Sequence, residues 1–331
     1  MPSTKDMLLE LRKCIPPLLE KYHKGQAGRI AVVGGSEDYT GAPFFSAQAA
    51  TLLGADMAHI VCEPSAAQVI KTYSPNLMVH PYMRDSRSYG PSGPTDAEFQ
   101  TIADKIQQFL DRVHVVVVGP GLGRDVLMQK LAKNVIMAAR DKKLHIIIDA
   151  DGLLLLQNYP EIIKGYPRAV ITPNVMEMRR LCAAYGIECP DNLSTNWDYI
   201  TDIAKNLSKT LGGLTVIAKG RTDVITNGVD TLSGDIRGGL KRVSGQGDTL
   251  SGTLATFLAW KNAYDANLWD HDKSLVESKL MLLAAFGASC VTRLCARKAY
   301  EKHGRSMLTS NISEQIGDVY RDLFENSQPV F

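Results

Sequence analysis

The chain of 331 residues lacks the cysteine patterns that mark metal modules and disulfide scaffolds. Its six cysteines form no Cys-x-x-Cys pair, and none has a histidine at the spacing of a zinc site. We therefore expect structural or chemically inert cysteines and a reducing compartment.

The sequence also has no large excess of charge of either sign and no long apolar run. The formal net charge is +2 and no segment is dense in Lys or Arg, which argues against a nucleic-acid partner. No apolar run approaches the ~20 residues that span a bilayer, so we expect no membrane association. The N-terminal segment contains acidic residues and prolines and resembles neither a secretory signal nor a mitochondrial presequence. We expect a cytoplasmic protein.

Short β-branched runs alternate with longer helical patterns, which predicts an α/β fold. Near-continuous apolar strands separated by helices indicate a mostly parallel sheet covered on both faces. Asn-Gly at 227–228 predicts a β-hairpin, residues 238–248 are a candidate for one more strand, and the rest of the chain is mostly helical. No linker divides the sequence, so we expect one domain over residues 1–331. The strands are expected within residues 29–35, 57–64, 76–83, 113–123, 144–152, 169–173 and 214–220.

The segment SGQGD, residues 244–248, precedes an apolar helical run. Glycines at a helix start let backbone N–H groups approach an anion, and the helix field favours negative charge there. Gly245, Gln246 and Gly247 therefore predict an anion hole, with Asp248 placed to take a proton from a hydroxyl. The simpler interpretation is that Asp248 and Thr249 only cap the helix. The helix field would also lower the pKa of this carboxylate and make it a weaker base, whereas a triphosphate would act the other way.

Three further motifs are compatible with nucleotide chemistry. Lys219 and Gly220 end an apolar strand, as in a turn that faces a nucleotide. Asn174 and Glu177 share a face at a predicted helix start and could order a hydrated Mg²⁺ beside phosphates. The turn GPGLG at 119–123 follows a strand, but Arg124 stands where a Rossmann motif needs its third glycine.

Taken together, SGQGD and the upstream NVME motif resemble the ribokinase-like superfamily. The blocks HKGQAGRIAVVGGSEDYTGAP, GPGLG, IIDADGL, ITPNVMEMRRL, AKG and SGQGDTLSG resemble, in order, those of its ATP-dependent NAD(P)H-hydrate dehydratase family. They extend from His23 to Gly252, and Gln246 matches the eukaryotic branch. The departures are Gln246, where a small residue is commoner in the superfamily, and the residue before Glu177.

The resemblance implies a three-layer α/β/α fold with a small hairpin near the nucleotide site. It implies ATP-dependent dehydration of (6S)-NADHX and (6S)-NADPHX, the C6-hydrated forms of NADH and NADPH, with release of ADP and phosphate. ATP is the co-substrate, Mg²⁺ the cofactor and an NAD(P)H-hydrate epimerase the companion enzyme. A homo-oligomer is left open.

The resemblance also implies residue roles. Asp248 is the catalytic acid/base, with Gly245, Gln246 and Gly247 around the transferring phosphate, and Asn174 and Glu177 are the metal neighbours. The hydrate is expected at Gly121, Asn174, Val175, Met176, Glu177, Met178, Arg179, Arg180 and Asp248. ATP is expected at Lys219, Gly220, Arg221, Thr222, Asp223, Gly238, Gly239, Leu240, Lys241, Arg242, Val243, Ser244, Gly245, Gln246 and Gly247.

Three alternatives stay open on the sequence. A vitamin or sugar kinase of the same fold would use the same residues but release a phosphorylated product. A nucleotide-binding protein without turnover is disfavoured by the presence of Asp248, Glu177 and Lys219. A Rossmann dehydrogenase is disfavoured by Arg124 and by the position of GPGLG late in the chain.

Overall fold

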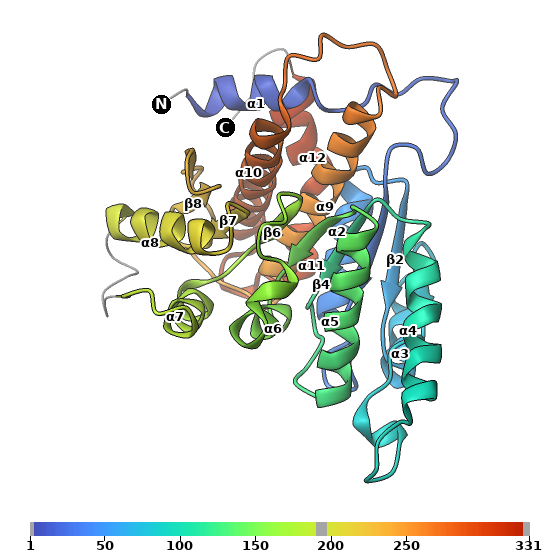
Figure 1. The fold of residues 1–331 in the computed structure, drawn as a ribbon. Coiled ribbons are helices and arrows are strands. Elements are labelled where there is room, and N and C mark those ends of the chain that lie inside the picture. The colour runs from blue at the N-terminus through green and yellow to red at the C-terminus, as the bar shows by residue number, and fades with distance from the viewer. Residues whose placement is uncertain (1–2, 190–196, 327–331) are drawn as a thin grey trace.

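The computed structural model describes residues 3–189 and 197–326. One nine-stranded sheet forms the centre of the molecule (Figure 1). Its strands are β1 (Arg29–Val33), β2 (Met57–Val61), β3 (Met78–His80), β4 (Val115–Val118), β5 (His145–Ile148), β6 (Ala169–Ile171), β7 (Thr215–Ala218), β8 (Asp223–Thr226) and β9 (Thr231–Gly234). The order is β3-β2-β1-β4-β5-β6-β7-β8-β9. Neighbours from β3 to β7 pair in parallel, whereas β8 and β9 pair antiparallel.

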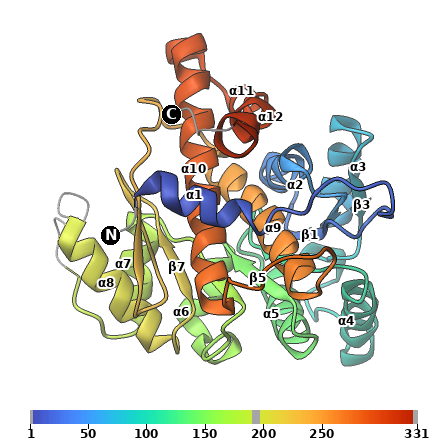
Figure 2. The same ribbon diagram turned by 90° about the horizontal axis from the view of Figure 1, so that it is seen from above.

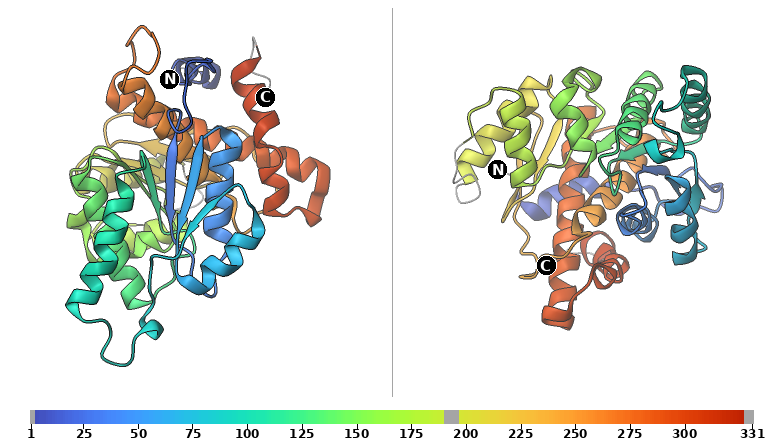
Figure 3. Two further views of the ribbon diagram at one scale, coloured as in Figure 1. Left: turned by 90° about the vertical axis from the view of Figure 1, so that its right-hand side faces the viewer. Right: turned by 90° about the horizontal axis from the view of Figure 1, so that it is seen from below.

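Helices cover both faces of this sheet. On one face lie α1 (Thr4–Arg12), α2 (Gly41–Leu53), α3 (Pro64–Tyr73), α9 (Gln246–Asp265), α10 (Glu277–His303), α11 (Thr309–Ser313) and α12 (Ile316–Tyr320). On the other lie α4 (Asp96–Leu110), α5 (Val126–Asp141), α6 (Gly152–Asn158), α7 (Val175–Ala184) and α8 (Trp197–Thr210). Figures 2 and 3 show the two helical layers on opposite sides of the strands. The three-layer α/β/α prediction is therefore confirmed.

Two hydrophobic cores follow from the two-residue period of the strands. In β4, Val115 and Val117 face the core under α9 and α10, whereas Val116 and Val118 face the core under α4 and α5. All four side chains are fully buried. This explains the continuous apolar runs of the sequence, because a parallel sheet covered on both faces has no solvent-facing side.

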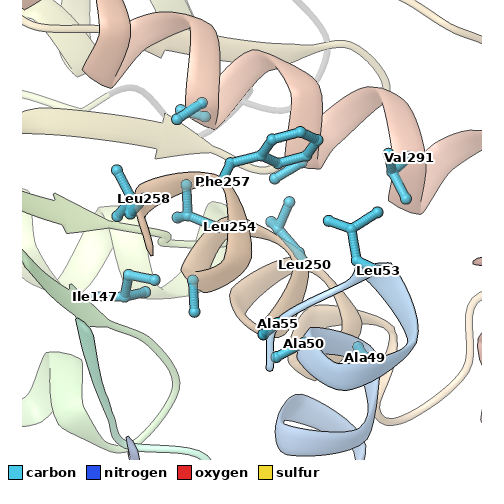
Figure 4. Close-up of a cluster of buried hydrophobic side chains, with 14 of the residues drawn as sticks. Ala49, Ala50, Leu53, Ala55, Ile147, Leu250, Leu254, Phe257, Leu258 and Val291 are labelled. Atoms are coloured by element: carbon cyan, nitrogen blue, oxygen red, sulfur yellow. The ribbon is translucent and has the colours of Figure 1, made fainter. Parts of the chain in front are cut away.

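Helix α9 lies in the centre of the first core, between α2, α10 and the sheet (Figure 4). It approaches α2 very closely at Gly252, where a Cβ atom would lie 2.0 Å from the carbonyl oxygen of Ser46. The hydroxyls of Ser46 and Ser251 hydrogen-bond across the same contact at 3.1 Å. This packing holds the N-terminal end of α9, which carries the SGQGD segment, in a fixed position against the sheet.

Helix α10 is the one described segment that is long and apolar enough to cross a bilayer. The candidate span is Glu277–Ser306, but 94% of its apolar window is buried inside the protein. Leu283, Phe286 and Leu294 all pack in the first core. Its hydropathy is thus explained by its place as a core helix.

Most predicted elements are confirmed, including the hairpin of β8 and β9 and the cap of α4 by Thr95, which forms a capping box with Glu98. The strand proposed within residues 238–248 is wrong. That segment leaves the sheet and packs along α10, where a Cβ on Gly239 would lie 2.5 Å from the carbonyl oxygen of Ala296. The six cysteines are free, and all but Cys189 are buried, as expected.

Candidate active site

The SGQGD segment forms the turn that opens α9. Gly245 is the N-cap, with φ +92°, a left-handed conformation that favours glycine. Thr309 fixes this turn from α11, since its hydroxyl donates to the carbonyl oxygen of Ser244. In the first turn of α9, the N–H groups of Gly247 and Asp248 have no partner in the described part of the chain. They are available to an anion. Of the anion hole predicted at Gly245, Gln246 and Gly247, this holds for Gly247, whereas the N–H of Gln246 donates to the carbonyl oxygen of Val243 at 3.4 Å.

Asp248 does not cap the helix. It lies in the first turn of α9, is 8% exposed and makes no capping hydrogen bond. Burial, and then the negative charge of Asp149, raise the pKa of Asp248 to about 8 against the opposing effect of Lys219. The expectation that the helix field leaves a weak base is therefore outweighed by burial. A carboxyl with a pKa near neutrality can both accept and return a proton.

Two more carboxylates lie beside Asp248 around a single lysine. The Nζ atom of Lys219 is 3.0 Å from Oδ1 of Asp149 and 3.6 Å from Oε2 of Glu177. Burial lowers the pKa of Lys219, but Asp149 and Glu177 outweigh that effect and the net pKa is raised. A Cβ on Gly247 would lie 3.6 Å from this Nζ atom, so the cluster adjoins the anion-hole turn.

Asp149 is a site residue that the sequence analysis missed. It is 2% exposed, and its Oδ1 accepts hydrogen bonds from the Thr172 hydroxyl at 2.6 Å and the Ala150 backbone at 2.9 Å. Ala150 has a positive φ of +48°, an unusual conformation for a residue with a side chain. The available signal was its position directly after an apolar strand, at the sheet edge where the strands before Asn174 and Lys219 also end.

The GPGLG turn packs directly against the turn that carries Asp149. A Cβ on Gly119 would lie 1.8 Å from the carbonyl oxygen of Asp149, so only glycine fits there. Gly121 is buried with φ +62° and lies against Tyr39. The N–H of Gly123 donates to Oδ2 of Asp151 at 3.0 Å. The contact of Gly121 with the hydrate stays a prediction.

A cavity of about 710 Å³ opens beside this cluster. It brings together many residues expected to bind ATP, namely Lys219, Gly220, Arg221, Asp223, Gly238, Arg242, Val243, Gln246 and Gly247. Asn174, Val175 and Met176, which were expected to contact the hydrate, line the same cavity. Leu250, Thr292 and Arg293 also line it and were not expected.

Arg293 of α10 shapes the nucleotide-facing turn. Its guanidinium donates to the carbonyl oxygens of Ile236 at 2.6 Å and Gly220 at 3.3 Å, and lies 3.1 Å from Asp223. Asp223 also accepts from the Ser289 hydroxyl at 2.7 Å and the Gly220 backbone at 3.0 Å. The side chain of Asp223 thus stabilises the turn at Gly220. The Arg293–Asp223 ion pair could not be predicted from sequence spacing, because the two residues lie far apart in the chain.

Other predicted site residues lie outside the cavity lining. Met178 is 2% exposed and packs in the second core, whereas Leu240 and Arg180 are exposed. Lys241 donates to the carbonyl oxygens of Arg305 and Met307, which ties its segment to the C-terminal helices. Also outside the lining are Gly121, Glu177, Arg179, Thr222, Gly239, Ser244, Gly245 and Asp248.

Asn174 and Glu177 form a capping box at the start of α7. Oδ1 of Asn174 accepts from the N–H groups of Met176 and Glu177 at 2.9 Å, and Oε2 of Glu177 accepts from the N–H of Asn174 at 2.7 Å. Within residues 3–189 and 197–326, no group of three His, Cys, Asp or Glu side chains could hold a metal ion. Because Oδ1 of Asn174 already accepts two backbone hydrogen bonds, it does not fit a direct metal ligand, whereas Oε1 of Glu177 fits an acceptor for the waters of a hydrated Mg²⁺.

The raised pKa of Asp248 predicts a pH-dependent stability. The pKa of this carboxyl is about 8 in the folded protein and about 3.9 in the unfolded chain. Its contribution to the free energy of unfolding is therefore complete below pH 4 and is lost as the pH rises to 8. The Asn side chain of the Asp248→Asn variant stays neutral at every pH. The stability of the variant relative to wild type should therefore increase by about 1 kcal/mol or more, a few °C in Tm, between pH 5 and 8.5. A Tm difference that does not change with pH would contradict the shift.

Comparison with known proteins assigns the chain to a family. A family model described as NAD(P)H-hydrate dehydratase matches residues 30–318. The chain belongs to this family. An ATP-dependent (S)-NAD(P)H-hydrate dehydratase of Neurospora crassa is 50% identical over 97% of this chain and 94% of that protein. A second family member of the same name, from Schizosaccharomyces pombe, is 42% identical over 99% of this chain and 96% of its own. The resemblance found in the sequence is thus confirmed.

Solved structures show the same fold. An ADP/ATP-dependent NAD(P)H-hydrate dehydratase of Bacillus subtilis, co-crystallised with ATP/Mg²⁺, superposes with a TM-score of 0.68 at 19% identity over 96% of this chain and 97% of that one. A hypothetical protein of Streptococcus mutans gives a TM-score of 0.72 at 22% identity over 96% of this chain and 98% of that one. The ribokinase-like architecture of the family is therefore present here.

Proposed function

We propose that the protein is an enzyme of nicotinamide-nucleotide repair, which uses ATP to dehydrate (6S)-NADHX and (6S)-NADPHX to NADH and NADPH with release of ADP and phosphate. The observation that carries the proposal is Asp248, a buried carboxyl with its pKa raised to about 8, directly after Gln246 and Gly247, which line the 710 Å³ cavity. It lies beside two N–H groups that have no partner among the described residues. The names of the fungal relatives support the same reaction.

Asp248 takes the proton of the C6 hydroxyl while that oxygen attacks the γ-phosphorus of ATP, and ADP leaves. The phosphate ester that forms is a good leaving group. The lone pair of the ring nitrogen expels it as phosphate, and loss of a ring proton restores the reduced nicotinamide. The N–H groups of Gly247 and Asp248 stabilise the transferring phosphoryl group, since they lie in the first turn of α9 and have no partner among the described residues.

Lys219 gives this site its second electrostatic element. It neutralises Asp149 and Glu177 and lines the cavity, so its ammonium lies where ATP phosphates are expected. Mg²⁺, when bound, neutralises phosphate charge. Oε1 of Glu177 would help to hold it by accepting hydrogen bonds from its water shell.

We also propose that the protein works in the cytoplasm, as a single domain over residues 1–331, alongside an epimerase that interconverts the two forms of the hydrate. The six free cysteines are consistent with a reducing compartment. Fluorescence localisation of the tagged full chain tests the compartment.

The reaction predicts a strict requirement for ATP and Mg²⁺. Incubation of the purified protein with NADPHX, ATP and Mg²⁺ should restore reduced-nicotinamide absorbance, with one ADP and one phosphate for each NADPH formed. Excess chelator or omission of nucleotide should abolish turnover. A stable phosphorylated hydrate in place of NADPH would identify a kinase of the same fold, and full turnover without nucleotide would overturn the proposal.

A further inference from the structure

A second cavity, of about 580 Å³, lies between α5 and α6 and shares no lining residue with the nucleotide cavity. We call it the α5–α6 groove. Arg124 and Val126 line it at the start of α5, and Met137 and Tyr159 line its other end. Because α5 and α6 both begin where parallel strands end, one end of the groove opens at the sheet edge that carries Asp248.

The charge in the groove has one sign. Arg124, Lys130 and Lys133 line it, and its lining within the described residues includes no Asp or Glu. Arg124 and Lys130 form no ion pair in the described part of the chain, and Lys133 has only a distant one, 3.8 Å from Glu161. Three poorly neutralised cations on one surface favour an anionic occupant.

The groove also presents aromatic rings beside its cations. Phe99 and Tyr159 line it, with Nζ of Lys130 4.2 Å from the centre of the Phe99 ring and Nζ of Lys133 3.6 Å from that of Tyr159. Val126 is 79% exposed and adds apolar surface. Rings, apolar surface and cations together suit a ligand that joins an aromatic base to phosphate.

The groove is connected to the proposed hydrate site through the GPGLG turn. The Nε2 group of Gln129, on the groove wall, donates to the carbonyl oxygen of Gly123 at 2.6 Å. Arg124 follows Gly121 by three residues, which span at most about 10 Å. A long ligand that passes Gly121 would therefore reach Arg124.

We propose that the α5–α6 groove binds the adenylate half of the hydrated dinucleotide, with Arg124 and Lys130 on its phosphates. This inference rests on the proposed function, because that reaction brings two adenine nucleotides to one site while the 710 Å³ cavity is expected to hold ATP. The three cations favour NADPHX over NADHX, because only the former carries an additional phosphate on its adenosine.

The test compares Arg124→Gln and Lys130→Gln with a matched control, Lys142→Gln, a lysine that follows α5 at its far end. KM for NADPHX should rise about tenfold in each groove variant, the scale of one lost charged hydrogen bond, with kcat and KM for ATP unchanged. KM for hydrated reduced nicotinamide mononucleotide, which lacks the adenylate, should not change. The control should match wild type.

A direct titration separates this inference from the reaction itself. ADP-ribose 2′-phosphate should bind wild-type protein saturated with ADP, and each groove variant should bind it about tenfold more weakly. Equal KM changes for full and truncated hydrates, or unchanged binding in the titration, would overturn the inference. A changed oligomeric state of the groove variants with an unchanged KM would also overturn the inference, because the groove would then be a subunit interface. Absence of wild-type turnover would instead overturn the proposed reaction.

Discussion

Asp248→Asn is expected to lower kcat by about 10²–10⁴-fold while the protein stays folded. Asn keeps the size of the side chain but cannot accept the hydroxyl proton. The structure strengthens this expectation, because Asp248 makes no capping hydrogen bond whose loss could explain a defect. The measurement pairs steady-state kinetics with thermal unfolding.

Asp125→Asn is the matched control for this substitution. Asp125 is the N-cap of α5, and its carboxylate accepts from the N–H groups of Leu127 and Met128 at 3.0 Å. Asn caps about as well as Asp, so neither stability nor kcat should change much. ATP should still bind to the Asp248→Asn protein, because the substitution leaves the backbone N–H groups at positions 247 and 248 in place. A well-folded Asp248→Asn protein with near wild-type kcat would leave the mechanism without its base.

Lys219→Met is expected to destabilise the protein by about 3–5 kcal/mol and to raise KM for ATP much more than KM for the hydrate. The effect on KM follows from the place of Lys219 in the lining of the cavity that is expected to hold ATP. The loss of stability follows from Asp149, which is 2% exposed and would lose the cation that lies 3.0 Å from it. Thermal or denaturant unfolding measures the loss of stability, and separate titrations of ATP and hydrate measure the two KM values.

A second-site change tests the electrostatic cause. Asp149→Asn in the Lys219→Met background removes the unpaired charge, so most of the lost stability should return while activity stays low. Lys13→Met is the control, since its ion pair with Asp272 has a similar distance of 3.1 Å but is half exposed and should contribute little. If Lys13→Met and Lys219→Met were equally destabilising, the buried pair would not be the reason.

The sequence by itself determined the elements whose signals are local. Apolar runs predicted the parallel strands, Asn227-Gly228 predicted the hairpin, and the glycines of SGQGD predicted the helix start after Gly245. The ordered motifs also gave the family. The strand prediction for residues 238–245 was wrong because their conformation is set by contact with α10 and not by their own sequence pattern.

Only the tertiary structure decided the environment of the charges. Asp149, Lys219 and Asp248 are far apart in the sequence, and the sheet brings them together at the edge where β5, β7 and the start of α9 meet. The sequence suggested a pKa lowered by the helix field, and burial among carboxylates reversed that direction. A pKa depends on every charge and on the solvent within a few ångströms, and those neighbours come from distant parts of the chain.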